Sequence, residues 1–459
     1  QRWGDYSSMN VDPIDDCTFW YTQEWYAANG GNWQTRIGSF KFNECGTPDF
    51  YLGATPPSQT VCAGADADYA INVGSIAGFT NAVTLSATGH PAGTTATFVP
   101  NPVTPPGAST FTVGNTGVAA GGTYSVTVGG AASGSPGHST AVELVIDAGN
   151  PTPAMLISPA NGATSVPLQP TFTWSAATGA SSYLIEVDDN SNFSSPEYSA
   201  TVVLTTATPA SNLPSNTQLY WRVTAINSCG STLSTVFSFT TEPLPGDCPA
   251  GTTTRPLYDY GFESGLAGWT SSGTGNTWAV STTAAYVHSG THAMHAFGPA
   301  TVSDQRLVSP AFVLPTGQDP VVLRFWNFQT IEDAPAGCFD GAILEISTDD
   351  GATWTQVLNA DLLTDPYDGV VSTSFANPLA NKTAWCGDPD PYIDSVADLS
   401  TWAGQSVRFR FRFGTDNKIG RTDGWNIDDV RVQSCLPDNT VFIGDFETGD
   451  TSQWSSVLP

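Results

Sequence analysis

Short runs in which apolar and polar residues alternate recur along most of the chain. YAINV, STFTV, TYSVTV and AVELVI are examples, and clusters of Gly, Pro and Asn separate such runs. Alternation with a period of two is typical of a strand with one buried face, and no long stretch has apolar residues at helical spacing. The pattern therefore predicts an all-β chain built from several modules. Its 459 residues suggest about three domains at roughly 150 residues each.

Composition narrows the possible partners. Acidic residues number 42 against 14 Lys and Arg, and the formal net charge is −28. Such a chain repels nucleic acid and anionic membrane surfaces, and no apolar run is long enough for membrane insertion, so we expect neither partner. The acidity suits a secreted protein that binds Ca²⁺, because this ion prefers carboxylate and carbonyl oxygens. The alternative is that the acidity only maintains solubility.

Cysteine usage predicts disulfides and hence a secreted, extracellular or cell-surface location. The cysteines are Cys17, Cys45, Cys62, Cys229, Cys248, Cys338, Cys386 and Cys435. Because they form no C-x-x-C or Cys/His cluster, zinc and redox motifs are absent. We expect Cys17 to pair with Cys45 and Cys338 with Cys386. The other four cysteines allow three pairings, between which the sequence does not choose.

The first segment, residues 1–53, is dense in aromatic residues. Its strings RWGDY and DDCTFWYTQEWY resemble the segment that closes a β-propeller in large secreted bacterial proteins. The alternative is a strand cap closed by a disulfide. The opening QRWGDYSSMN has neither the basic nor the apolar region of a signal peptide, so we expect the chain to be the later part of a larger precursor.

Two sandwiches are predicted next. The alternating runs of residues 54–148 describe a seven-strand immunoglobulin-like (Ig-like) sandwich. In residues 149–242, the strings PTFTWSA, SSYLIEVDD and TQLYWRVTAIN resemble a fibronectin type III domain. That resemblance implies that Trp174 and Leu213 lie in its core. The segment contains no Arg-Gly-Asp sequence, so we expect it to act as a spacer.

Residues 243–436 form the largest unit. GFESGLAGW, CFDGAILEISTDDGATW and GWNIDDVRV occur in this order. They resemble the jelly-roll module of immune inhibitor A-type secreted metalloproteases and, more distantly, MAM and carbohydrate-binding jelly rolls. The predicted fold class is thus a series of tandem β-sandwiches, Ig-like and fibronectin type III-like, followed by a jelly roll. The resemblance implies a fold more strongly than a ligand, because this architecture hosts many partners.

The tail, residues 437–459, repeats the opening of the jelly roll. Its DFETGDTSQW matches GFESGLAGW in the order of aromatic, Glu, hydroxyl residue, Gly and Trp. One short strand is marginal by itself but gains stability at the edge of a sheet. We expect Val441, Ile443 and Phe446 to dock on such an edge, either of the same jelly roll or of the next molecule in a head-to-tail polymer. The alternative is a stub without structure.

A calcium site is the main chemical expectation. In jelly rolls of the kind that residues 243–436 resemble, the first and last strands lie side by side and Ca²⁺ commonly joins them. The resemblance implies Glu263 with Asp428 or Asp429 as ligands, completed by backbone carbonyls near Ser289 and Gly290. The alternative is that these acids only cap strand ends in solvent. Alternation along NIDDV predicts that the two Asp side chains point to opposite faces, so that only one is a ligand.

Two motifs suggest catalysis or metal binding without requiring either. Ser347, Asp349, Gly351, Thr353 and Trp354 fit the S-x-D-x-G-x-T-W box of sialidases. One copy without an arginine cluster is better interpreted as a hairpin, in which Asp caps turn amides and Gly takes a positive φ. The histidines of HSGTHAMH are divided by a turn and by alternation, so we expect no shared metal.

We predict that the chain is not an enzyme. It has no H-E-x-x-H or G-x-S-x-G motif. The first functional hypothesis is a non-catalytic adhesion or targeting array whose jelly roll binds a glycan or protein surface. The alternatives are a subunit of an extracellular filament and the accessory end of a secreted enzyme with its catalytic domain upstream. The candidates for stacking on sugar rings are Trp278, Trp326, Trp385 and Trp425.

Overall fold

The computed structural model describes residues 7–13, 17–25, 34–42, 46–388 and 392–438. These residues form strands and loops with three short 3₁₀ turns, at Thr116–Val118, Ala284–Tyr286 and Ser400–Trp402. The predicted all-β class is confirmed. Within the described ranges, no helix has the length and apolarity needed to cross a membrane. Contacts divide the chain into two compact units, the first made of Gln1–Asn161, Pro170–Ala210 and Leu219–Ser238, and the second of the remaining residues.

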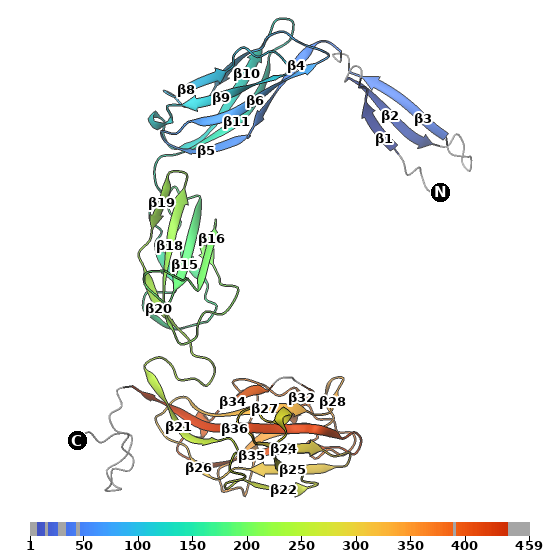
Figure 1. Ribbon diagram of the computed structural model, residues 1–459, viewed down its shortest axis with the longest axis vertical. Helices are drawn as coiled ribbons and strands as arrows, with labels where there is room; N and C mark the ends of the chain where they lie inside the picture. Colours follow the sequence, from blue (N-terminus) through green and yellow to red (C-terminus); the bar gives the residue numbers. More distant parts are fainter. Residues whose placement is uncertain (1–6, 14–16, 26–33, 43–45, 389–391, 439–459) are drawn as a thin grey trace, which may run out of the picture. The chain divides into compact units, whose positions relative to one another are not determined.

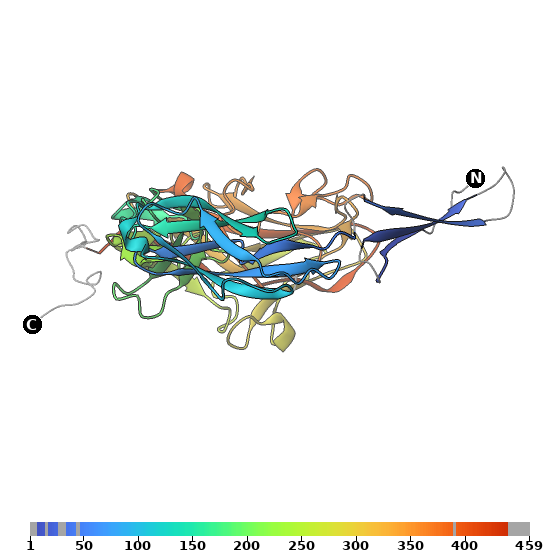
Figure 2. The ribbon, with the colours of Figure 1, turned by 90° about the horizontal axis from the view of Figure 1, so that it is seen from above.

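The N-terminal segment forms one twisted antiparallel sheet (Figures 1 and 2). Its strands are β1 (Ser7–Val11), β2 (Thr18–Trp25) and β3 (Gln34–Lys41). Three strands give too little area for a core, and large apolar side chains such as Ile37 and Met9 are exposed. Closure of a propeller by this segment stays a prediction, as does the Cys17–Cys45 pair, because Cys45 lies outside the described residues.

The Ig-like sandwich consists of two four-stranded sheets, one strand more than predicted. The first sheet has the order β4 (Asp49–Thr55), β6 (Ala67–Ile76), β9 (Gly107–Gly114), β8 (Thr95–Val99). The second has the order β5 (Ser58–Cys62), β11 (His138–Asp147), β10 (Gly122–Ala131), β7 (Thr84–Thr88). Along β6, Tyr69, Ile71 and Val73 are buried and their neighbours Ala70 and Asn72 are exposed, as alternation predicts. Because β4 pairs with β6, this sandwich begins before residue 54.

The fibronectin-like sandwich also has two sheets. The smaller has the order β12 (Leu156–Ser158), β14 (Phe172–Trp174), β17 (Thr206–Ala207). The larger has the order β13 (Ala163–Val166), β20 (Phe237–Thr241), β18 (Gln218–Asn227), β15 (Ser182–Asp188), β16 (Tyr198–Val202), and β19 (Gly230–Leu233) pairs with β18. Trp174 and Leu213 are buried, as the resemblance implied.

The jelly roll packs two six-stranded sheets, which we call the β27 sheet and the β35 sheet (Figure 1). The β27 sheet has the order β23 (Ala279–Ser281), β24 (Ala293–Gly298), β36 (Arg421–Pro437), β27 (Val321–Thr330), β34 (Ile393–Asp398), and β21 (Thr252–Tyr260) pairs with β36. The β35 sheet has the order β22 (Thr270–Thr274), β25 (Ser303–Val308), β35 (Ser406–Thr415), β30 (Gly341–Ser347), β31 (Thr355–Gln356), and β26 (Phe312–Val313) pairs with β35. Short pairs β28 (Asp333–Ala334) with β29 (Gly337–Cys338) and β32 (Gly369–Val370) with β33 (Thr383–Ala384) complete it.

The core between these two sheets is aromatic. Phe325, Trp385, Phe411 and Trp425 are completely buried there and contact one another through their rings. The first and last strands lie side by side, as predicted, because β21 pairs antiparallel with β36 from Thr252 opposite Pro437 to Tyr260 opposite Val430. This pairing brings both ends of the module to the β27 sheet.

Three disulfides lie within the described residues, and the structure pairs cysteines whose partners the sequence left open. Cys338–Cys386 is confirmed. Cys248–Cys435 joins the two ends of the jelly roll. Cys62–Cys229 joins β5 of the Ig-like sandwich to the turn between β18 and β19 of the fibronectin-like sandwich.

Candidate ligand-binding pocket on the jelly roll

Strand β27 carries the side chains on which the candidate site is built. Leu323 and Phe325 enter the core, whereas Arg324 and Trp326 are half-buried on the outer face of the β27 sheet. Arg324 lies opposite Arg431 of β36, and Trp326 lies opposite Asp428 of β36 and Asp394 of β34. Residues directly opposite in antiparallel strands share a face, so this region of the sheet collects polar side chains around one indole.

A β-bulge in β36 changes the arrangement that alternation predicts. Between the partners of Arg324 and Trp326 the register shifts by one residue, and Asp429 takes a φ of 46°. An extra residue in one strand re-aims the side chains beside it. The expectation that Asp428 and Asp429 point to opposite faces is therefore wrong, because both carboxylates contact the same loop, at His288 and Ser289.

Asp428 and Asp429 anchor that loop. The backbone N–H of His288 donates to Asp428 Oδ2 (2.9 Å), and the Ser289 hydroxyl donates to Asp429 Oδ1 (2.9 Å). His288 Nδ1 lies 2.8 Å from Asp429 Oδ2. Burial is the main cause that raises the pKa of Asp428 to about 6, and the neighbouring Asp429 charge adds to it.

Glu263 anchors the same loop two residues further on. Its carboxylate accepts hydrogen bonds from the Thr291 N–H (2.8 Å), the Thr291 hydroxyl (2.7 Å) and the His292 N–H (2.9 Å). The Thr291 hydroxyl is the largest cause that lowers the Glu263 pKa to about 2. Gly290 makes this approach possible, since a Cβ at that position would lie 2.3 Å from Glu263 Oε1.

These contacts bear on the predicted calcium ligands. The structure brings Glu263, Asp428, Asp429, Ser289 and Gly290 to one loop, as the resemblance implied. However, the loop presents N–H groups to the carboxylates, and an N–H group cannot ligate a cation. Calcium at this position stays a prediction, and the same carboxylates already act as anchors that hold the loop against β36.

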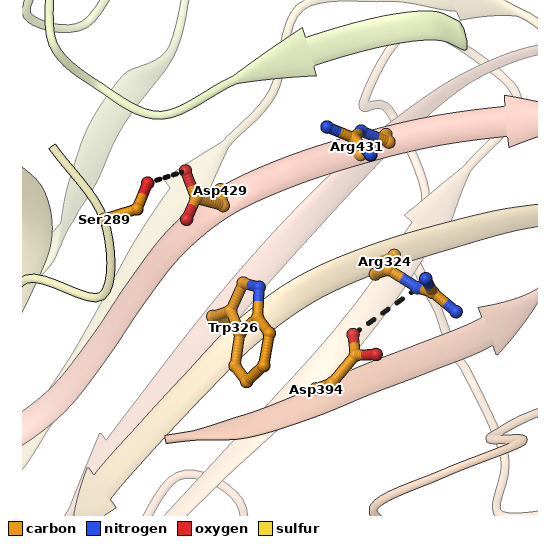
Figure 3. A pocket seen from close by; sticks show the side chains of 6 residues that line it. All are labelled: Ser289, Arg324, Trp326, Asp394, Asp429 and Arg431. Atoms are coloured by element: carbon orange, nitrogen blue, oxygen red, sulfur yellow. Dashed lines mark hydrogen bonds and ion pairs between the residues drawn. The ribbon is translucent and has the colours of Figure 1, made fainter. Parts of the chain in front are cut away.

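A pocket of about 270 Å³ opens between this loop and the sheet (Figure 3). The residues that line it are Ser289, Arg324, Trp326, Asp394, Asp429 and Arg431. Arg324 Nε lies 3.5 Å from Asp394 Oδ1, and a second Arg324 nitrogen donates to Asp247 Oδ1 (2.9 Å). Arg431 pairs with Asp259 at 2.7 Å. Both guanidinium groups are thereby held in place beside the indole.

Aromatic rings fix the indole of Trp326. The His288 ring stacks on it with centroids 3.7 Å apart and an interplanar angle of 12°. Tyr392 contacts the His288 ring edge-on, and its hydroxyl donates to the Tyr286 carbonyl at 2.6 Å. The pocket thus combines one preoriented aromatic surface with two cations and two carboxylates.

The other three tryptophan candidates are not part of any outer surface. Trp278 is 5% exposed, and Trp385 and Trp425 are completely buried in the core. The prediction that they stack on a ligand is wrong, because all three side chains are buried in the jelly-roll core. The predicted assembly residues Val441, Ile443 and Phe446 lie outside the described residues.

The sialidase-like box is a hairpin, as interpreted. Asp349 Oδ1 accepts the Thr353 N–H (2.8 Å), Gly351 has a φ of 92°, and Trp354 Nε1 donates to the Gly351 carbonyl (3.0 Å). Asp349 therefore caps the turn between β30 and β31.

The three histidines of HSGTHAMH have different partners. His288 stacks on Trp326, His292 Nδ1 contacts the Glu263 carboxylate, and His295 stacks on Tyr286.

Sequence reasoning missed Arg324, Asp394 and Arg431. A signal for Arg324 was present, because alternation in VVLRFWNF places it on the same face as Trp326. Asp394 and Arg431 come from other strands, and their positions depend on the strand order and the bulge.

Comparison with known proteins adds little to this geometry. Neither a protein-family model nor a curated protein matches the chain. A solved structure from a study of carbohydrate-binding modules of the β-sandwich superfamily is 16% identical and covers 62% of this chain and 98% of its own, with a TM-score of 0.27. The Clostridium thermocellum CbhA fibronectin(III)-like modules are 13% identical and cover 42% of this chain and 93% of their own, with a TM-score of 0.25. TM-scores this low carry no functional argument.

Proposed function

We propose that this chain is a non-catalytic extracellular binding array whose jelly roll binds a neutral glycan in the pocket around Trp326. The observation that carries the proposal is the combination, in one pocket, of a preoriented indole with paired cationic and anionic side chains. The disulfides of the described residues support an oxidising, extracytoplasmic compartment.

The charge balance of the pocket favours a neutral polyhydroxylated ligand. Arg324 and Arg431 donate hydrogen bonds, and Asp394 and Asp429 accept them. A sugar hydroxyl both donates and accepts, so it can satisfy both kinds of partner. A phosphate or carboxylate would meet two anions, and a cationic ligand would meet two guanidinium groups.

Size and aromatic contact agree with a sugar. Apolar C–H faces of a sugar ring pack on an indole, and Trp combines an apolar body with a polar tip. The pocket volume of about 270 Å³ lies just below the roughly 300–1,000 Å³ that encloses drug-sized ligands. It suits one end or one ring of a longer glycan whose remaining rings stay in solvent.

The test is a glycan array probed with the full chain under oxidising conditions. Wild type should bind a set of neutral glycans, Trp326→Ala should lose this signal, and Trp354→Ala should keep it. Trp354 is a matched control, because it is another half-buried tryptophan of the same jelly roll outside the pocket. The proposal is contradicted if wild type binds no neutral glycan or if Trp326→Ala binds as well as wild type. Binding to a protein surface and to no glycan would also contradict it.

A further inference from the structure

A second site lies away from the pocket, where three acidic side chains of the jelly roll meet. One carboxylate oxygen of each of Glu332, Asp340 and Asp416 lies within 4.8 Å of the other two. The three residues are 7%, 1% and 2% exposed, respectively. Carboxylates are rarely buried to this extent unless a partner balances their charge.

The strands of both sheets bring these residues together. Glu332 follows β27, Asp340 precedes β30, and Asp416 follows β35. The pairing of Gly341 with Gly414 holds Asp340 near Asp416, whose N–H donates to Asp340 Oδ1 at 2.6 Å. The N–H groups of Phe339 and Asp340 donate to the Glu332 carbonyl at 3.1 and 3.0 Å. The cluster is therefore built by the backbone of three chain segments rather than by mobile side chains.

Among the residues that the structure describes, one oxygen of the cluster lacks a hydrogen-bond donor, whereas Asp340 accepts the N–H of Asp416 and Asp416 accepts the N–H of Lys418. Within the described part of the chain, Glu332 Oε2 is enclosed and has no hydrogen-bond partner. An enclosed oxygen without a donor points to a missing cationic partner.

We propose that Glu332, Asp340 and Asp416 bind a calcium ion that joins the β27 sheet to the β35 sheet. The donor set is entirely carboxylate oxygen, without His or Cys, and such hard donors select hard cations over zinc or copper. Three carboxylates favour Ca²⁺ over Mg²⁺, because Mg²⁺ keeps several waters and usually binds through one or two carboxylates. Water molecules would supply the remaining oxygen ligands of the ion.

Two other acidic groups differ from this cluster. Asp188, Asp189 and Glu197 also lie close together, but Asp189 and Glu197 are exposed and Asp188 accepts the N–H groups of Asn190 and Ser195. Glu263 is likewise exposed and accepts several donors from its loop. Neither group has the enclosed, unpartnered oxygen of Glu332, and Glu197 supplies the control.

The experiment uses the full chain after removal of divalent cations and compares three Glu→Gln variants. Calcium is titrated by calorimetry, and bound calcium is counted by equilibrium dialysis. At a concentration about 100 times its Kd, Ca²⁺ should raise the folding equilibrium constant about 100-fold and the Tm of the jelly-roll transition by about 5–10 °C. Glu332→Gln should lose one bound calcium and this shift, whereas Glu197→Gln should keep both. Glu263→Gln should keep the calcium of this cluster and reports separately on the ion predicted at the first and last strands. Mg²⁺ at the same concentration should give a smaller shift.

Equilibrium dialysis counts the calcium ions bound to folded protein, so it distinguishes a lost calcium site from a mere change in stability. Near-UV circular dichroism verifies that each variant is folded. If Glu332→Gln folds poorly, Asp416→Asn provides the same comparison. The proposal fails if wild type binds no calcium, if Glu332→Gln and Asp416→Asn bind as much as wild type, or if only Glu263→Gln loses the ion. The last result would instead place calcium at the first and last strands.

Discussion

His288 and Trp326 stack face to face, with ring centroids 3.7 Å apart and an angle of 12° between the rings. His288 belongs to the loop that Asp428 and Asp429 hold, and Trp326 belongs to the middle of β27. One face of the indole is thus committed to the protein, and the remaining surface borders the pocket. The carboxylates that anchor the loop and the residues that line the pocket are therefore coupled through this stack. Mutation of His288 can test the coupling.

Replacement of His288 tests this coupling. His288→Ala removes the stack and should lower the free energy of unfolding by about 0.5–1.5 kcal/mol, the usual contribution of an aromatic pair. His288→Phe restores a stacked ring but not the contact with Asp429, and should recover most of the loss. Urea unfolding of the two variants measures the difference. Equal stabilities of His288→Ala and wild type would show that the stack contributes nothing.

A side chain at Gly290 should destabilise the protein more than one at a glycine of equal φ with free space, because Glu263 lies beside Gly290. Gly290→Ala combines a φ of 68° with a Cβ that would lie 2.3 Å from Glu263 Oε1. Gly317 has the same φ of 68° but no neighbouring atom within 4 Å, so Gly317→Ala carries only the backbone strain of about 1–3 kcal/mol. Thermal unfolding should show a larger loss for Gly290→Ala than for Gly317→Ala. A loss of equal size in both variants would mean that the Glu263 contact is easily displaced.

The hydrogen bonds of Asp349 in its hairpin should make the stability of the folded state depend on pH. Hydrogen bonds from Thr353, first from its hydroxyl and then from its N–H, lower the pKa of Asp349 to about 2. The folded state thus binds a proton less tightly than the unfolded chain. This stabilisation is present above the unfolded pKa of about 4 and is lost as pH falls through the folded pKa.

The measurement is the Tm of wild type and Asp349→Asn between pH 2 and pH 6. The Tm difference should be largest at pH 6 and shrink between about pH 4 and pH 2. Asp350→Asn is the control, since Asp350 is exposed and meets Arg408 instead. A difference that is constant over this range would show that the charge of Asp349 is not what holds the turn.

The Cys62–Cys229 bond should stabilise the pair of sandwiches that it joins. It closes a loop of 167 residues, and disulfides typically contribute about 2–4 kcal/mol by restricting the unfolded chain. Ser228 supports the joint, because its N–H and hydroxyl donate to Asp147 Oδ2 at 3.0 and 2.7 Å. The double variant Cys62→Ser/Cys229→Ser should unfold at lower urea concentration and be cut sooner by chymotrypsin after Met155 or Leu156, which follow the connection between the two sandwiches. Unchanged midpoints and cleavage rates would contradict this role.

Alternation was sufficient to predict the all-β class. In β6 and β18, the apolar residues that alternate in the sequence are the residues that are buried in the structure. Trp174 and Leu213 lie in the core, as the resemblance implied. Alternation says which residues share a face, but it does not say whether that face meets solvent or a second sheet. For this reason the sequence did not distinguish Trp278, Trp385 and Trp425 from Trp326 as ligand-stacking candidates. Of these four, only Trp326 faces outward.

Features that depend on tertiary register could not be predicted. The bulge at Asp429 lets the carboxylates of both Asp428 and Asp429 contact one loop, and NIDDV contains no Gly or Pro that would indicate the bulge. The meeting of Glu332, Asp340 and Asp416 depends on pairings across 76 residues, such as that of Asp416 with Asp340. The Cys62–Cys229 pair joins two modules, so an expectation of pairing within modules would not find it.

The most direct test of the proposed function is isothermal titration calorimetry of the full chain with the strongest neutral glycan from the array. Trp326→Ala should weaken binding at least tenfold, which corresponds to about 1.4 kcal/mol. Trp354→Ala should bind with the wild-type Kd. Equal Kd values for wild type and Trp326→Ala, in protein shown to be folded, would contradict glycan binding at this pocket.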